Sequence, residues 1–192
     1  MLVFVAFGLP FLAAVPVNLF SVFYAKSIDL DMGVYGKLLA LSYTVSLGLA
    51  YFLGWAADRF HPLRAGMAAI ALYAAAMFWA GTCIHDNLTF GIAFVAHVVL
   101  SGAVGTTMAS LGQRLFPVAK FAQFASALGI ITSIATILLA PAVGTFLGYT
   151  GHIYRYTFLF GAILAILGLA CMLLLHREFM ARGGPRHYVA PE

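Results

Sequence analysis

Six long stretches of apolar residues fill almost the whole chain, and short polar segments separate them. A helix needs about 20 apolar residues to cross the roughly 30 Å hydrocarbon core of a bilayer, and each stretch is that long. The apolar residues do not alternate with polar ones, which excludes the strands of a membrane barrel. The pattern therefore predicts six membrane-spanning helices, at about residues 2–24, 34–57, 63–82, 88–111, 121–147 and 156–175.

Composition supports the same conclusion. The chain is 64% hydrophobic and only 8% charged, with a mean hydropathy of +1.02, whereas a soluble domain carries about 25% charged residues. We therefore expect an all-α integral membrane protein. The net charge of +4 does not indicate nucleic-acid binding, because the basic residues lie in short loops and in the tail rather than on one aromatic-rich face.

The distribution of Lys and Arg predicts the topology. An even number of spans places both termini on one side, and the side with more basic residues is cytoplasmic. We expect a six-helix domain over residues 1–176, followed by a polar cytoplasmic tail over 177–192. The terminal side would hold Arg59, Arg64, Arg114, Lys120, Arg177, Arg182 and Arg186, and the other side Lys26, Lys37 and Arg155.

Polar side chains at membrane depth are confined to four of the six predicted helices. Such groups are costly in hydrocarbon unless they face a bundle interior or a wet cavity, whereas helices that are apolar all round face lipid. We expect the first, second, fourth and fifth helices to line a cavity and the third and sixth to lie outside. The candidate substrate-binding residues are Asn18, Tyr43, His97 and Ser101.

Three of these candidates also have a purely structural interpretation. Asn18 follows Pro10 and Pro16, and it marks either a transport site at a broken helix or a side chain bonded to a freed carbonyl. His97, the ionisable residue deep in a predicted span, either relays a proton or bonds to a neighbour. Tyr43 either stacks on a solute or packs against other side chains.

The loop between the second and third helices carries the most specific motif, which reads Gly54-Trp-Ala-Ala-Asp58-Arg59-Phe-His61-Pro-Leu-Arg64. An acid at a helix C-terminus opposes the helix dipole, so Asp58 needs a partner: Arg59, Arg64 or the N-terminus of a neighbouring helix. The motif resembles the signature loop of the major facilitator superfamily, although His61-Pro62 replaces the usual Gly-Arg. Residues 115–127 are similar to the start of helix eleven in bacterial sugar-type and nucleoside-type members.

This resemblance implies the C-terminal half of a secondary transporter, with six helices in a 3+3 inverted repeat. A sugar or nucleoside would move by alternating access, in an inner membrane, as a symporter with possible proton coupling through His97 or as a uniporter. Helices one and four would face the cavity. The gating loop, formed by Gly54, Asp58, Arg59 and Arg64, would hold the inner ends of the two halves together.

Two other classes of protein are alternatives to a transporter half. A stand-alone six-helix protein would form a homodimer or serve as an accessory subunit, in place of pairing with an N-terminal half. An intramembrane enzyme needs a convergent nucleophile and base or a set of metal ligands, and the sequence has no Gly-x-Ser-x-Gly, no His-Glu-x-x-His and no paired aspartates within spans. We therefore expect no enzyme, no cofactor and no metal.

Overall fold

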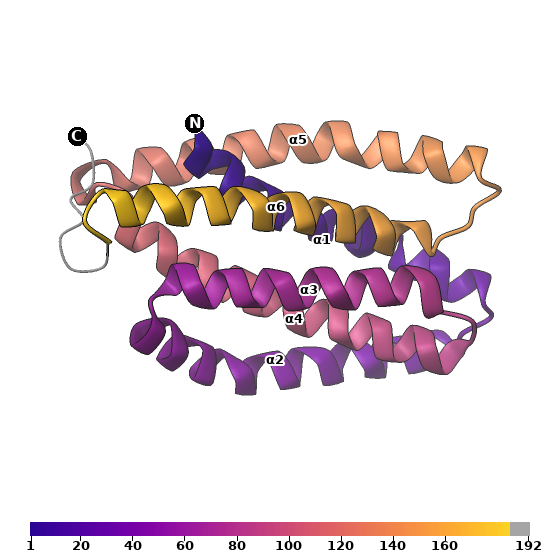
Figure 1. The fold of residues 1–192 in the computed structure, drawn as a ribbon. Helices are drawn as coiled ribbons and strands as arrows, with labels where there is room; N and C mark the ends of the chain where they lie inside the picture. Colours follow the sequence, from indigo (N-terminus) through magenta and orange to yellow (C-terminus); the bar gives the residue numbers. More distant parts are fainter. Residues whose placement is uncertain (185–192) are drawn as a thin grey trace.

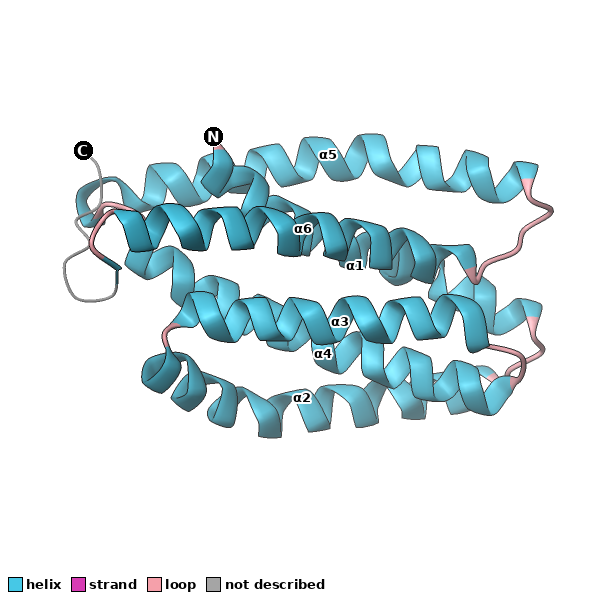
Figure 2. Cartoon of the chain, viewed as in Figure 1, coloured by secondary structure: helices cyan, strands magenta, loops and turns pink. Residues whose placement is uncertain are grey.

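The computed structural model describes residues 1–184, and over that range all regular structure is helical (Figures 1 and 2). Each long helix has the length and hydropathy needed to cross a membrane, so the prediction of an all-α, multi-pass membrane fold is confirmed. A short 3₁₀ turn, η1 (Val118–Lys120), precedes the fifth helix. The six helices are α1 (Leu2–Ser27), α2 (Met32–Phe60), α3 (Pro62–Cys83), α4 (Asn87–Leu115), α5 (Phe121–Tyr149) and α6 (Tyr156–Ala181).

The helices extend a few residues beyond the apolar stretches that predicted them. The largest difference is at α6, which continues to Ala181 rather than ending near residue 175. The helix persists because Phe179 is buried and Glu178 lies 3.9 Å from Arg182, one turn later. The first part of the predicted polar tail is therefore helical, and its residues 185–192, including Arg186, lie outside the described residues.

Aspartate side chains cap the starts of two helices. The Asp31 carboxylate accepts a hydrogen bond from the backbone N–H of Val34 at the start of α2. Asp86 and Thr89 form a capping box at the start of α4, where Asp86 accepts from the Thr89 backbone at 2.7 Å. The hydrogen bonds from Thr89 lower the pKa of the Asp86 carboxyl. These caps satisfy N–H groups that a helix end leaves unpaired.

The six helices run up and down, so that the start of α1 and the end of α6 lie at the same end of the bundle (Figure 1). The contacts follow a spatial order that differs from the chain order. Helix α6 packs against α1 and α3, and α4 packs against α3 and α2. Helix α5 contacts mainly α1. Helices α5 and α2 therefore lie at opposite margins, the top and bottom of Figure 1, with the other four between them.

Glycines allow the central helices to approach closely. A Cβ on Gly161 of α6 would lie 2.9 Å from the carbonyl oxygen of Ala13 in α1. A Cβ on Gly168, two turns further, would lie 3.1 Å from the Pro10 ring. Small residues at a helix interface bring backbones together, which is how helices associate in lipid. The contact between α1 and α6 therefore depends on these two positions.

The two marginal helices are the least buried. Only 6% of the apolar window of α2 and 11% of that of α5 is buried within the described chain, against 39% to 44% for the other four helices. The expectation that α3 and α6 are the outermost helices is therefore only half correct. Each has an exposed apolar face, with Leu72 and Phe78 on α3 and Ile163 and Ile166 on α6. Their other faces belong to the core, because a helix that suits lipid equally suits an apolar helix interface.

The glycine contacts generate a stability prediction. Gly161→Ala should destabilise the protein by about 1–3 kcal/mol, because the new methyl meets a backbone oxygen that cannot easily move. Gly36→Ala in α2 is the matched control, since a Cβ there meets nothing within 4 Å. The thermal unfolding midpoint of the detergent-solubilised protein should fall for Gly161→Ala and stay within a degree or two for Gly36→Ala. Equal midpoints for the two variants would contradict the packing described above.

Candidate functional site

A groove with several polar groups on its wall lies between α1, α2 and α4. Its volume is about 560 Å³, and none of the residues that line it is charged. Three of the four predicted substrate-binding residues, Asn18, Tyr43 and Ser101, lie on its wall. The full lining is Phe11, Ala14, Asn18, Ser21, Tyr35, Leu39, Tyr43, Ser46, Phe94, Val98, Ser101 and Gly102.

The hydroxyl groups on the groove wall differ in whether they already have a hydrogen-bond partner. The Ser21 and Tyr35 hydroxyls bond to each other at 2.9 Å, and Ser101 donates to the backbone carbonyl of Val98. The Ser46 hydroxyl is buried without a hydrogen-bond partner in the described part of the chain. Tyr43 is 62% exposed, so its ring is available to a solute. A wall of neutral hydroxyl, amide and aromatic groups suits an uncharged polar molecule.

The fourth predicted residue, His97, lies behind the groove wall and is fully buried. Its Nε2 atom is 2.9 Å from Oδ1 of Asn18, and its Nδ1 atom is 3.0 Å from the Tyr73 hydroxyl. The Tyr73 hydroxyl in turn donates to the carbonyl of Ala13 at 3.2 Å. Asn18 therefore bonds to His97 and not to a carbonyl freed by Pro16. This network connects α1, α3 and α4 at the middle of the bundle.

Tyr73 is the side chain of this network that was not among the predicted substrate-binding residues. It lies in α3, whose middle has no strongly polar side chain and which was therefore expected to face lipid. Its ring is 1% exposed, and its hydroxyl reaches both His97 and Ala13. A tyrosine in an otherwise apolar span was the available signal, because a buried phenol usually has a hydrogen-bond partner. The identity of that partner depends on contacts 24 and 60 residues away along the chain.

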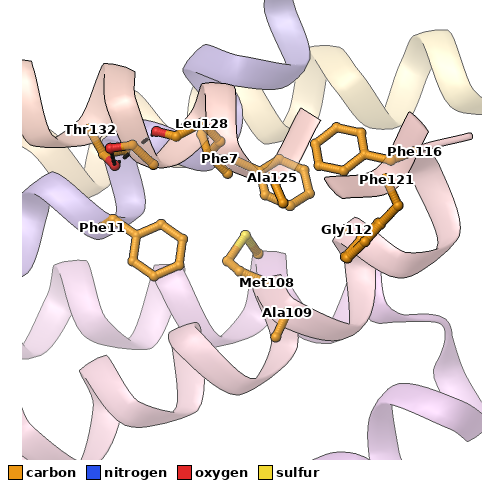
Figure 3. A pocket seen from close by; sticks show the side chains of 11 residues that line it. Phe7, Phe11, Met108, Ala109, Gly112, Phe116, Phe121, Ala125, Leu128 and Thr132 are labelled. Atoms are coloured by element: carbon orange, nitrogen blue, oxygen red, sulfur yellow. Dashed lines mark hydrogen bonds between the residues drawn. The ribbon is translucent and has the colours of Figure 1, made fainter. Parts of the chain in front are cut away.

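A second cavity, of about 340 Å³, lies between α1, α4 and α5 (Figure 3). Phe7, Phe11, Met108 and Phe116 point toward it, and Thr132 is the lining residue with a side-chain hydroxyl. That hydroxyl already donates to the backbone carbonyl of Leu128 at 2.9 Å, drawn as a dashed line in Figure 3. This cavity is apolar and offers a polar solute little to bind, so the polar groove is the better candidate.

The ion-pair partner of Asp58 in the gating loop differs from the expected one. Asp58 pairs with Arg114, at the C-terminal end of α4, with 3.2 Å between carboxylate and guanidinium. The prediction that Arg59 or Arg64, or a neighbouring helix N-terminus, partners Asp58 is therefore wrong in the described chain. The Arg59 guanidinium instead lies over the Trp55 ring, 5.5 Å from its centroid. Arg114 is 56 residues from Asp58, so only the packing of α2 beside α4 reveals the pair.

His61 stands where the signature loop usually has glycine, and its backbone explains that preference. Its φ of 74° lies in the left-handed region that glycine adopts without steric cost. The imidazole provides compensation, since Nδ1 accepts a hydrogen bond from the Leu63 N–H at the start of α3. Burial, assisted by the nearby charges of Arg114 and Arg64, lowers the pKa of His61. An unprotonated Nδ1 is what this acceptor role requires.

The predicted site residues thus separate into two places. Asn18, Tyr43 and Ser101 line one groove with His97 behind it, whereas the gating loop lies at the end of the bundle where α2 ends. Gly54, which the structure places within α2, has open space around it, since a Cβ there would meet nothing within 4 Å. Within residues 1–184, no three His, Cys, Asp or Glu side chains are grouped so that they could hold a metal ion.

Comparison with known proteins gives one match. The model of the family described as Major Facilitator Superfamily matches residues 2–188, which is nearly the whole chain. No curated protein and no solved structure matches it. The match agrees with the six apolar helices and with the loop motif around Asp58. The chain belongs to the major facilitator superfamily.

Proposed function

We propose that this chain is the C-terminal half of a secondary transporter, and that it moves a small, uncharged polar solute of sugar or nucleoside type by alternating access. The observation that carries the proposal is the groove, where an amide, several hydroxyls and an exposed tyrosine meet without any charged side chain. Hydroxyl-rich solutes are recognised by such groups, because each can donate or accept a hydrogen bond. Membership of a transporter family also fits a protein that is not an enzyme.

The exposed sides of α2 and α5 support pairing with another bundle. Tyr43 is exposed on α2 at membrane depth, where lipid offers its hydroxyl no partner. Gly105 of α4 and Gly129 of α5 have open space around their Cα atoms in the described chain. We propose that an N-terminal six-helix half of the same protein covers this side. The alternative occupant is a second copy of this chain or a larger protein to which it is an accessory subunit.

The orientation and coupling form part of the same proposal. The end of the bundle where α1 begins and α6 ends also carries Arg59, Arg114 and Arg177, which lie near the C-terminal ends of α2, α4 and α6, and we assign this end to the cytoplasm of a cell with an inner membrane. Proton symport would use His97, since it is the ionisable group bonded to a groove residue, Asn18. The two sets of three helices would be related as an inverted repeat.

The groove generates a binding prediction at Tyr43, which lines it and is 62% exposed. Tyr43→Phe should lower the apparent affinity for the transported sugar or nucleoside about fivefold, since one neutral hydrogen bond contributes roughly 1 kcal/mol. Stability should not change, because no internal hydrogen bond is lost. Uptake by proteoliposomes containing the complete protein measures this. The control is Thr82→Val on α3, whose hydroxyl bonds to the Phe78 carbonyl; an equal loss in both variants would argue against the groove.

The ion pair generates a gating prediction. Asp58→Asn should slow uptake several-fold while leaving the unfolding midpoint nearly unchanged, because the side chains are 80% and 45% exposed and such pairs contribute about 1 kcal/mol or less. The double variant Asp58→Arg with Arg114→Asp should recover much of the rate. Both positions are near helix C-termini, so the exchange leaves the helix-dipole terms balanced. Full uptake by Asp58→Asn would remove the gating role.

The half-transporter proposal predicts the size of the native product. An antibody against the C-terminal residues should detect, in source membranes, a band near twice the 20.5 kDa of this chain. A band at 20.5 kDa would instead favour the stand-alone protein. Crosslinking of those membranes would then separate the two remaining alternatives, since a homodimer doubles the mass and an accessory subunit adds a different one.

A further inference from the structure

We infer that Tyr73 and His97 fix the orientation of the Asn18 amide, so that its oxygen faces the groove as a hydrogen-bond acceptor. Asn18 lines the groove and at the same time contacts the buried His97. The inference follows from counting protons along the chain of hydrogen bonds from Ala13 to Asn18. It deepens the proposed function, and only its consequence for a solute rests on that function.

The Tyr73 hydroxyl has one proton to donate. The carbonyl oxygen of Ala13 can only accept, so the 3.2 Å hydrogen bond between them uses that proton. Gly161 leaves room for this contact, because a Cβ there would lie 2.9 Å from the same carbonyl oxygen. The Tyr73 oxygen must then accept at its other contact, from Nδ1 of His97 at 3.0 Å. This assigns a proton to Nδ1.

The next hydrogen bond joins His97 to Asn18. Both hydrogen-bond partners of the buried ring, Tyr73 and Asn18, are uncharged, and a buried charge without a counter-charge is costly. The ring is therefore neutral and has a single N–H, on Nδ1. Its Nε2 is an acceptor and needs a donor, which only the Asn18 NH₂ group supplies among its contacts.

The amide orientation follows from this requirement. With Oδ1 toward Nε2, the network needs either a second proton on His97 or the loss of the hydrogen bond between Tyr73 and Ala13. A half-turn of the Asn18 amide exchanges its oxygen and nitrogen without changing its shape. That half-turn satisfies every group in the network and turns Oδ1 toward the groove. Asn18 then accepts a hydrogen bond from a hydroxyl or N–H of the solute.

This arrangement makes Tyr73 and His97 positioning residues for solute specificity. Neither lines the groove, and they act only through the amide of Asn18. A site that accepts from a solute O–H discriminates against an analogue without that donor, because the buried acceptor is left unpaired. The ligand class is therefore a neutral solute with a hydrogen-bond donor at the position opposite Asn18.

The test is to locate the proton on His97 by nitrogen-15 NMR of the complete protein in lipid bilayers at neutral pH, with labelled histidine. The His97 signals are those lost in His97→Gln. In the wild type we expect a protonated Nδ1 and a bare Nε2. Tyr73→Phe removes the acceptor for the Nδ1 proton, so the Nε2–H form should appear and the share of the Nδ1–H form should fall.

Tyr35→Phe is the matched control, because it removes a hydroxyl from the same groove that bonds to Ser21 and not to His97; the tautomer should not change. A wild-type ring protonated on Nε2, or on both nitrogens, would overturn the inference. So would a Tyr73→Phe variant with an unchanged tautomer. The Nδ1–H form in a protein that takes up no sugar or nucleoside would support the amide orientation while refuting the proposed function.

Discussion

The hydrocarbon core of a bilayer offers no hydrogen-bond partners, and this constraint shapes every part of the molecule. Backbone groups are satisfied within six helices, each long enough to cross the membrane. Polar side chains in the spans bond back to carbonyls of their own helix, as Ser42 and Thr107 do, or to one another. Ser46 does neither, since its hydroxyl is buried in the groove wall without a hydrogen-bond partner in the described chain.

The same constraint gives the buried network its importance. His97, Tyr73 and Asn18 belong to three different helices, and each depends on the others for its hydrogen bonds. The network can form because α1 approaches α6 closely at Gly161, which places the Ala13 carbonyl within reach of Tyr73. Packing between apolar helices thus determines the chemistry presented at the polar groove. A change in helix spacing would therefore alter the hydrogen bonding of Asn18 at the groove wall.

The external surface of the bundle has two different characters. The exposed faces of α3 and α6 are apolar and suit lipid. Helices α2 and α5 instead combine exposed apolar side chains with polar groups and with glycines that have open space around them. The ion pair between Asp58 and Arg114 lies at the end of the bundle where α2 terminates. The groove and this ion pair therefore both involve α2 and α4.

Sequence alone determined the six spans, because a run of apolar residues has one stable placement in a bilayer. It also showed that Asn18, Tyr43, His97 and Ser101 are polar side chains at membrane depth, because such side chains are conspicuous in an apolar stretch without any structure. It could not assign partners. The ion pair of Asp58 with Arg114, the place of Tyr73 in the network and the central position of α3 and α6 all depend on contacts between residues far apart in the chain. Hydropathy gives the depth of a residue in the membrane, whereas the direction in which it faces is decided by how the helices pack.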